Sequence, residues 1–340
     1  MPVNKKRAIC KAIFPILLAL LFTGCSEDGD SPPASDSATT ERAYVTNNGS
    51  GAISVIDTTN YTLIATVNVG GSPAGIGVDV QSNRAYFTDL SAGSISVLDT
   101  TSNSELSEIL VGSTPLAGFA VNSVANKLYA ADFSDAIGQA GNISVINTSS
   151  NSVTTFAVGT RLQDIAVDST TGRVYVTDFG DGASGNGTVK VVENNMVLTS
   201  ISSGTESHGV DVDPNASRLY VTNLGDNTVS VFDTLSNTII TTINVGDTPQ
   251  SVAVYAAIAR AYVTNEADDT VTVINTANNT VATTVNVGDS PQGLAVDTAN
   301  GMVYVTNAND NSVSVIDSSN NIVVATIAVG SQPVRVAIAP

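Results

Sequence analysis

A short phrase built on tyrosine recurs seven times along this chain and restricts its possible folds more than any other feature. The best-kept copies read Tyr-Val-Thr-Asn, and successive tyrosines are 42 to 46 residues apart. The copies begin at Tyr44, Tyr86, Tyr129, Tyr175, Tyr220, Tyr262 and Tyr304. A fixed period in this range is typical of repeated four-stranded sheets, so the repeat predicts the fold before any other motif is considered.

One complete repeat, residues 291–330, shows how each unit is built. It contains four short apolar segments, at 291–297, 303–306, 312–317 and 322–329. The segments are rich in β-branched residues, are bounded by Asn, Asp and Gly, and show no helical period. We therefore expect four antiparallel strands per repeat, named A, B, C and D in chain order.

The two ends of the repeat region complement each other. The phrase at Tyr44 has no A strand before it, whereas an unmatched A-like segment, residues 334–338, follows the last complete repeat. This predicts an all-β, seven-bladed β-propeller whose C-terminal strand joins the first blade, which closes the ring and hides sheet edges. A linear array would need capping repeats, and the sequence shows none. We expect residues 42–340 to form this single domain.

The N-terminal residues have the pattern of an export signal. A basic region with Lys5, Lys6 and Arg7 precedes an apolar stretch that is too short to span a bilayer. The stretch ends in Leu-Phe-Thr-Gly-Cys-Ser at residues 21–26, which resembles the lipobox of bacterial lipoproteins. This resemblance implies that residues 1–24 are a lipoprotein signal peptide and that Cys25 is lipidated. An ordinary cleaved secretory signal is the alternative.

The same resemblance places the protein in the bacterial cell envelope. The serine after the cysteine is similar to the sorting pattern for the outer membrane, and the side of that membrane is left open. Residues 25–41 are rich in Ser, Asp and Pro, and we expect a flexible acidic tether. After removal of residues 1–24, Cys25 is the only thiol, so no intramolecular disulfide is possible.

The charge of the chain excludes one class of partner. The formal net charge is −18, and it becomes more negative once the basic signal is removed. Nucleic-acid binding needs a basic footprint, so no nucleic-acid partner is expected. Such acidity favours solubility and attracts divalent cations, although a solvated acidic surface without any partner gives the same composition. We expect a monomer.

The repeat also resembles a known family. The phrase Tyr-Val-Thr-Asn, followed by Val-Ser-Val-Ile-Asp and then by Val-Gly-x-x-Pro, is similar to the YVTN-type β-propeller repeat and covers nearly all of residues 42–340. Such proteins are secreted, periplasmic or surface proteins of bacteria and archaea, described as surface-layer or lactonase-like. The resemblance implies the propeller fold, with ligand sites on the face formed by the D-to-A and B-to-C connections, around the central channel.

Cations occupy one register on the opposite face. The residue two positions before the tyrosine is a cation in six of the seven copies: Arg42, Arg84, Lys127, Arg173, Arg218 and Arg260. Asp79, Asp168 and Asp213 end the preceding A strands, so we expect cross-strand charge pairs with Arg84, Arg173 and Arg218. A docking surface for anionic lipid or polysaccharide is the alternative.

Two connections break the repeat. The distance from the last residue of the phrase to the first apolar residue of the C strand is 6 residues in most blades. It is 11 residues in blades 3 and 4, after Asp132 and after Asp178. Added loop length is where binding function tends to lie. Asp178 and Asp181 can supply oxygen ligands to Ca²⁺, but their spacing matches no specific metal motif, so plain solvated turns are the favoured interpretation.

Polar residues also gather where the A strands begin, at the expected mouth of the channel. They are candidates for ligand binding: Gln163, Asp164, His208, Gln250, Gln292 and Arg335. His208 is the only histidine and is a candidate general acid/base. Asp164 and Arg335, in blades 4 and 1, can pair across the channel or hold opposite ends of a polar ligand. Hydrogen bonding to neighbouring loops is the alternative role.

Several catalytic patterns are absent from the sequence. It contains no zinc-ligand spacing, no nucleophile-elbow serine and no phosphate-binding glycine loop. The sequence therefore favours a lipid-anchored envelope propeller that binds a small polar ligand or an envelope protein, on the face with the long loops of blades 3 and 4. A lactonase-like or lyase-like enzyme using His208, Arg335 and Asp164 is one alternative, and a passive surface-layer coat protein is another.

Overall fold

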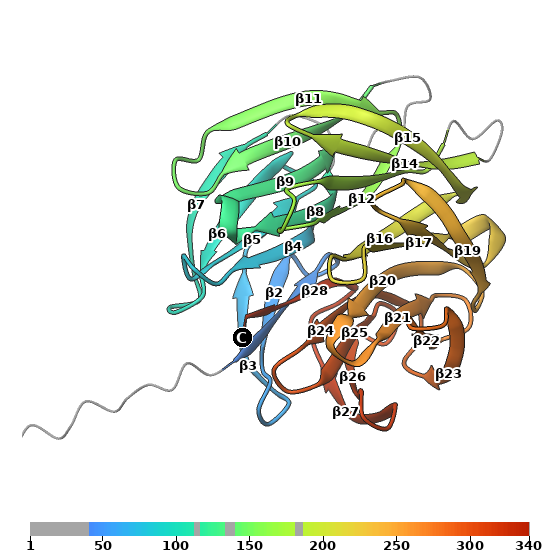
Figure 1. The fold of residues 1–340 in the computed structure, drawn as a ribbon. Helices are drawn as coiled ribbons and strands as arrows, with labels where there is room; N and C mark the ends of the chain where they lie inside the picture. Colours follow the sequence, from blue (N-terminus) through green and yellow to red (C-terminus); the bar gives the residue numbers. More distant parts are fainter. Residues whose placement is uncertain (1–40, 112–115, 133–139, 181–185, 340) are drawn as a thin grey trace, which may run out of the picture. The chain divides into compact units, whose positions relative to one another are not determined.

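Seven sheets, each with four antiparallel strands, make up the propeller (Figure 1). The structure is a computed structural model that describes residues 41–111, 116–132, 140–180 and 186–339. Strand order within each sheet is A-B-C-D, as the sequence predicts. Cys25 and Asp181 lie outside the described residues. Within the described ranges, no helix is long and apolar enough to cross a membrane.

The strands follow the repeat blade by blade. The A strands are β28 (Pro333–Ala339), β4 (Pro73–Asp79), β8 (Leu116–Asn122), β12 (Leu162–Val167), β16 (Ser207–Asp213), β20 (Pro249–Tyr255) and β24 (Pro291–Asp297). The B strands are β1 (Arg42–Asn47), β5 (Arg84–Asp89), β9 (Lys127–Asp132), β13 (Val174–Asp178), β17 (Arg218–Asn223), β21 (Arg260–Asn265) and β25 (Met302–Asn307).

The outer two strands of each blade complete the sheets. The C strands are β2 (Ala52–Asp57), β6 (Ser94–Asp99), β10 (Gly141–Asn147), β14 (Asn186–Glu193), β18 (Thr228–Asp233), β22 (Thr270–Asn275) and β26 (Ser312–Asp317). The D strands are β3 (Thr62–Asn68), β7 (Ser104–Leu110), β11 (Val153–Gly159), β15 (Met196–Thr205), β19 (Thr238–Asn244), β23 (Thr280–Asn286) and β27 (Ile322–Ala328). Three short 3-10 turns connect strands: η1 (Ser123–Ala125), η2 (Leu224–Asp226) and η3 (Ala256–Ile258).

The predicted ring closure is confirmed. The C-terminal strand β28 pairs antiparallel with β1, with Tyr44 opposite Ala337 and Thr46 opposite Arg335. In Figure 1 the red end of the chain lies beside the blue first blade. Each A strand contacts the A strands of both neighbouring blades, so the seven A strands surround the central channel.

The core lies between blades rather than within them. Each of seven clusters of buried apolar side chains draws on two neighbouring sheets. The tyrosine of each phrase belongs to such a cluster; Tyr44, for example, packs with Ile76 and Phe87 of the next blade. The Tyr44 hydroxyl also donates to the Thr100 carbonyl oxygen of that blade, at 3.1 Å. The tyrosine of each phrase therefore packs between two neighbouring blades.

The threonine of the phrase makes a second inter-blade connection, which we call the threonine bridge. In blade 6 the Thr264 hydroxyl oxygen accepts from the Ser251 amide of its own A strand, at 3.0 Å, and donates to the Gln292 carbonyl of blade 7, at 2.8 Å. The same double contact is made by Thr46, Thr177, Thr222 and Thr306. Blade 3 has Ala131 at this position and lacks the hydroxyl.

The cation register differs from the expectation. Asp79 lies opposite Arg84 and Asp213 opposite Arg218 in the strand register. None of the three expected pairs, including Asp168 with Arg173, forms an ion pair among the described residues. The A-strand carboxylates accept hydrogen bonds from their own turns, as Asp213 does from the Asn215 and Ala216 amides. Two of the cations reach the C strand instead: Arg218 pairs with Asp233 at 3.2 Å, and Arg173 with Glu193 at 3.2 Å. Arg84 donates to the Thr148 carbonyl oxygen of the next blade at 3.3 Å.

Removing one threonine bridge should destabilise the propeller measurably. Thr264→Val keeps the shape of the side chain but leaves the buried Ser251 amide and Gln292 carbonyl without their partner, so we expect a loss of about 1–3 kcal/mol in the free energy of unfolding. Urea unfolding followed by circular dichroism measures the change. Thr242→Val, at an exposed D-strand position, is the matched control and should change stability by less than about 0.5 kcal/mol. Equal stability of the two variants would contradict the role of the bridge.

Candidate functional site

A β-bulge near the start of each A strand sets the wall of the channel. Pairing between the A and B strands shifts register there in every blade. Each bulge contains two residues, such as Gln163 and Asp164 in β12, which we call the first and second bulge positions. In blades that have the threonine, the amide of the second position donates to the threonine hydroxyl, as Asp164 does to Thr177 at 2.9 Å. Bulges often occur at functional sites because they redirect side chains.

Glycine and alanine form most of this wall and leave space within it. At the second bulge position four blades have glycine: Gly75, Gly118, Gly209 and Gly293. The other three blades have Asp164, Ser251 and Arg335. Two residues further along the A strands all blades have glycine or alanine except blade 5, which has Asp211. These four polar residues are the departures from sevenfold repetition in the channel wall.

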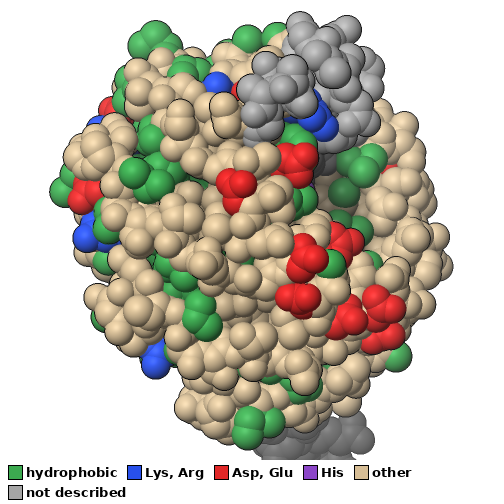
Figure 2. Space-filling view, turned by 90° about the vertical axis from the view of Figure 1, so that its right-hand side faces the viewer, with side chains coloured by type: hydrophobic (Ala, Val, Ile, Leu, Met, Phe, Trp, Pro, Cys, Tyr) green, Lys and Arg blue, Asp and Glu red, His purple; other side chains and the backbone are tan. Residues whose placement is uncertain are grey.

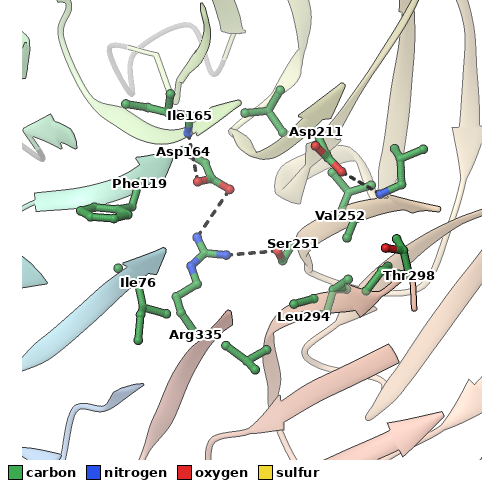
Figure 3. A pocket seen from close by; sticks show the side chains of 17 residues that line it. Ile76, Phe119, Asp164, Ile165, Asp211, Ser251, Val252, Leu294, Thr298 and Arg335 are labelled. Carbon is green, nitrogen blue, oxygen red and sulfur yellow. Dashed lines mark hydrogen bonds and ion pairs between the residues drawn. The ribbon is translucent and has the colours of Figure 1, made fainter. Parts of the chain in front are cut away.

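A cavity of about 320 Å³ lies where these residues meet (Figure 3). Its polar lining residues are Asp164, Asp211, Ser251, Thr298 and Arg335. Much of the remaining lining is aliphatic, including Ile165, Val252 and Leu294. The size and the few polar groups on an apolar wall are typical of sites for small molecules.

Arg335 reaches across the channel from blade 1. Its Nη2 lies 3.6 Å from Oδ2 of Asp164 in blade 4, and its Nη1 donates to the Ser251 hydroxyl in blade 6 at 3.1 Å. Both charged side chains are largely buried, at 21% exposure for Arg335 and 14% for Asp164. Burial raises the pKa of Asp164, and the Arg335 guanidinium offsets part of this effect.

Gly293 makes room for the arginine. A Cβ atom at this residue would lie 3.1 Å from Cδ of Arg335 and only 2.5 Å from the Val334 carbonyl oxygen. The close approach of blades 7 and 1 therefore requires glycine here, and the same lack of a side chain lets the Arg335 stem pass.

Asp211 is the second acid of the cavity. Its Oδ2 accepts from the Val254 amide of the next blade at 2.7 Å, and its Oδ1 accepts from the Val212 amide at 2.8 Å. Burial raises the pKa of Asp211 to about 7, and the nearby Asp164 carboxylate adds to the shift, whereas the two amide hydrogen bonds oppose it. Asp211 therefore changes protonation state near neutral pH.

Of the six ligand-binding candidates, the structure places two in the cavity wall, Asp164 and Arg335. The other four, Gln163, His208, Gln250 and Gln292, occupy the first bulge position, and none of them lines this cavity. The Gln250 amide group donates to Glu266, and that of Gln292 donates to the Ser290 hydroxyl at 3.4 Å. Gln163 is buried.

His208 is held by a backbone carbonyl. Its Nδ1 lies 3.0 Å from the Gln250 carbonyl oxygen, which only accepts, so Nδ1 carries the hydrogen and Nε2 keeps its lone pair. Burial, with the Arg335 charge as the next cause, lowers the pKa of His208 to about 4. The imidazole is therefore neutral at pH 7.

Asp178, the described half of the proposed Ca²⁺ pair, is surrounded by donors. It accepts from the Thr160 and Arg161 amides, each at 3.2 Å, and pairs with Lys190 at 3.4 Å. Burial acts to raise the pKa of Asp178, but these hydrogen bonds and the lysine outweigh it and lower the pKa. Across the described residues there is no group of three or more His, Cys, Asp or Glu residues that could hold a metal ion.

Sequence reasoning missed Asp211 and the contact made by Ser251. Asp211 lies two residues beyond Gly209 on β16, and side chains two residues apart on a strand share a face. Comparing the blades at this position singles out Asp211 as the one ionisable residue in its register.

The face with the D-to-A and B-to-C connections is acidic over blades 5 to 7. Figure 2 shows this face, with the acidic side chains gathered on one part of it. Between residues 203 and 332, the D-to-A and B-to-C connections contain no Lys or Arg. They contain eight acids: Glu206, Asp226, Asp247, Glu266, Asp268, Asp269, Asp289 and Asp310. A cluster of one sign raises the local concentration of cations around the channel mouth.

Comparison with known proteins gives one family and several similar folds. A family model described as "Lactonase, 7-bladed beta-propeller" matches residues 117–287. No protein with a curated description matches the sequence. Among solved structures, a protein of unknown function from Desulfotomaculum acetoxidans DSM 771 is 14% identical, with a TM-score of 0.74 over 87% of this chain and 98% of that one.

Two further structures share the fold at similarly low identity. The hydrazine synthase of Kuenenia stuttgartiensis is 15% identical, with a TM-score of 0.71 over 81% of this chain and 91% of that one. Apo AztD from Citrobacter koseri is 14% identical, with a TM-score of 0.64 over 88% and 97% of the two chains. At these identities the likeness concerns the fold alone.

The titration of Asp211 should appear in the stability of the protein. A pKa raised from 3.8 to about 7 means that ionising Asp211 costs stability as the pH rises through this range. Asp211→Asn lacks this loss, so from pH 5 to pH 8 its stability should improve relative to wild type by about 1 kcal/mol or more. Urea unfolding at both pH values measures the difference. Asp233→Asn, whose carboxyl has a lowered pKa, should show no trend in this range, and a flat difference for Asp211→Asn would refute the assignment.

Proposed function

The chain belongs to the lactonase, seven-bladed β-propeller family, and on that basis we propose that it binds a small polar molecule in its central channel. The observation that carries this proposal is the cavity of about 320 Å³, in which Asp164, Asp211, Ser251 and Arg335 replace the glycine and alanine of the other blades. A channel wall that served only packing would not need two partly buried acids and a partly buried arginine, because removing charge from water is costly.

The polar groups of the cavity are held in place before any ligand arrives. Asp164 accepts from the Ile165 amide at 3.0 Å, Arg335 is fixed between Asp164 and Ser251, and Asp211 is fixed by two amides. Groups held in this way lose little conformational entropy on binding, which favours affinity for a small ligand.

We further propose that the propeller works as a lipid-anchored module of the bacterial cell envelope. The support is the Leu-Phe-Thr-Gly-Cys-Ser sequence at residues 21–26 and the Ser/Pro-rich segment that follows it. The described chain enters the propeller at Arg42, the first residue of β1, on the face opposite the B-to-C connections.

Lactone hydrolysis is the second candidate, favoured by the family match. Asp211, with its pKa near 7, is suited to activate water as a general base, and Arg335 can stabilise the oxyanion that forms on the carbonyl oxygen. His208, the base expected from the sequence, does not line the cavity and would act only through a group that does.

Filling the cavity should weaken binding without removing any polar group. Ala253 lines the cavity from β20, and Ala253→Leu places additional side-chain atoms inside it. We expect compounds that bind wild type, from a panel of small amines, carboxylic acids, sugars and γ-lactones, to lose affinity about tenfold or more, as measured by calorimetry. Ala277→Leu, in an exposed turn, is the control and should bind as wild type does.

Two results would refute the channel as the binding site: a panel with no binder, or a binder that ignores Ala253→Leu. The two candidate functions are separated by incubating the protein with each γ-lactone of the same panel and titrating the acid that hydrolysis releases. Hydrolysis that is lost in Ala253→Leu supports the enzyme, whereas binding without hydrolysis supports the binding module.

The anchor can be tested independently of the channel. Expressed in a Gram-negative host, the full chain should partition into the detergent phase and the membrane fraction, because an acylated cysteine adds buried CH₂ groups. Cys25→Ser should move it to the soluble fraction, whereas Cys10→Ser, within the signal itself, should not. Membrane association that survives Cys25→Ser would disprove lipidation.

A further inference from the structure

We propose that the channel cavity accepts a small organic cation, an ammonium group on a short aliphatic body, with the ammonium bound at the Asp211 carboxylate. This inference rests on the proposed function, because it names the class of ligand for the same cavity. It starts from the charges of the lining residues.

The charges in the cavity do not balance. The lining contains one cation, Arg335, and two acids, Asp164 and Asp211. Arg335 and Asp164 form an ion pair with each other. Within the described part of the chain no Lys, Arg or His forms an ion pair with Asp211. The cavity therefore has one acid, Asp211, that pairs with no cation among the described residues.

An anionic ligand fits this arrangement poorly. Binding an anion at Arg335 would draw the guanidinium away from Asp164 and leave two buried carboxylates without a cation. An unpaired buried charge is strongly unfavourable, so the existing ion pair disfavours this mode. A cation at Asp211 leaves the Arg335–Asp164 pair intact and compensates the remaining charge.

The geometry of Asp211 suits a donor with several hydrogens. Each carboxylate oxygen already accepts one amide hydrogen, from Val212 at 2.8 Å and Val254 at 2.7 Å. A carboxylate has about four acceptor positions, so about two are free for donors from a ligand. The hydroxyl groups of Ser251 and Thr298, which also line the cavity, are neutral acceptors for further ammonium hydrogens. In Figure 3, Asp211, Ser251 and Thr298 lie on the same side of the pocket.

The other walls fit an aliphatic body rather than a bare metal ion. Val210, Val252, Leu294 and Val296 line the cavity, and Phe119 adds an aromatic ring. A metal ion would need several oxygen ligands, and the described residues hold no group of three acidic, His or Cys side chains that could supply them. The acidic connections of blades 5 to 7 would in addition attract cations towards the channel mouth.

Binding of such a ligand must be linked to pH. The ionisable groups nearest to Asp211 are His208 and Asp213 on its own strand β16, Asp164 on β12 and Arg335 on β28. In the free protein the pKa of Asp211 is about 7, so a large share of the carboxyl is protonated at pH 6. An ammonium requires the ionised form, so binding releases a proton and affinity rises from pH 6 to pH 8, where alkylamines remain charged.

Calorimetry with n-butylammonium chloride, on the full chain, tests the inference. We expect binding at pH 8 that is about fivefold or more weaker at pH 6, with proton release seen as a dependence of the heat on the buffer. Asp211→Asn should weaken binding about tenfold or more, since it removes a charge-assisted hydrogen bond. The control Asp226→Asn, an acid of the outer face, should change affinity less than about twofold.

Neutral, anionic and metal probes identify other outcomes. Butanol, butyrate and Ca²⁺ should each bind much more weakly than butylammonium at pH 8. No binding of butylammonium, equal binding of butanol, or unchanged binding in Asp211→Asn would each overturn the inference. If butyrate or a sugar binds instead and Ala253→Leu removes that binding, the channel site stands and only its cation preference is wrong.

A measurement on wild type keeps the test valid if Asp211→Asn fails to fold. Carboxyl ¹³C NMR titration should show that saturating butylammonium lowers the pKa of Asp211 by about one unit or more, whereas butanol leaves it unchanged. An Asp211 titration unaffected by butylammonium would overturn the inference.

Discussion

The wall of the channel depends on the threonine bridge, which joins neighbouring blades through Thr46, Thr177, Thr222, Thr264 and Thr306. Each threonine bridge joins the bulge of its own A strand to the bulge of the next blade, as Thr264 joins Ser251 to Gln292. The bridge satisfies two buried backbone groups that a bulge would otherwise leave without partners. The tyrosine two positions before the threonine packs neighbouring blades together, whereas the threonine hydroxyl fixes the bulges of the two blades relative to each other. Because the bridged bulges form the channel wall, the same bond that joins the blades also determines which side chains face the channel.

This coupling explains why the candidate site tolerates charge. Asp164 and Arg335 occupy bulge positions whose amides are bound to Thr177 and Thr46. Their backbones are thereby fixed, and the 3.6 Å pair across the channel needs little further ordering. Gly293 contributes the missing volume through which the arginine passes. Asp211 differs because its partners are amides alone, which leaves its charge uncompensated and its pKa near 7. The contrast between a compensated pair and a single acid gives the cavity its expected preference among ligands.

The fold was predictable because it depends on what repeats, and the site was only partly predictable because it depends on what does not. The spacing of the phrase and the unmatched segment at 334–338 were enough to predict seven sheets and their closure. Asp164 and Arg335 were found as departures from the repeat. Asp211 was missed because the strand alternation beyond the bulge was not followed, and His208 was misleading because adjacent bulge residues point in different directions. Sequence position alone also could not decide that Arg218 pairs with Asp233 rather than with Asp213. Each of these acids lies directly opposite Arg218, one on each neighbouring strand.

Closure of the ring by β28 has a consequence for the order in which the cavity is assembled. As the chain is synthesised, Asp164, Asp211 and Ser251 all leave the ribosome before Arg335, which belongs to the last strand. A growing chain therefore holds both acids of the channel while it still lacks the guanidinium that balances one of them. Only when β28 docks beside β1 does the cavity gain its cation and its seventh wall at the same moment. A chain that stops short of residue 333 lacks β28 and Arg335, so it can form neither the closed ring nor the Asp164–Arg335 pair of the cavity.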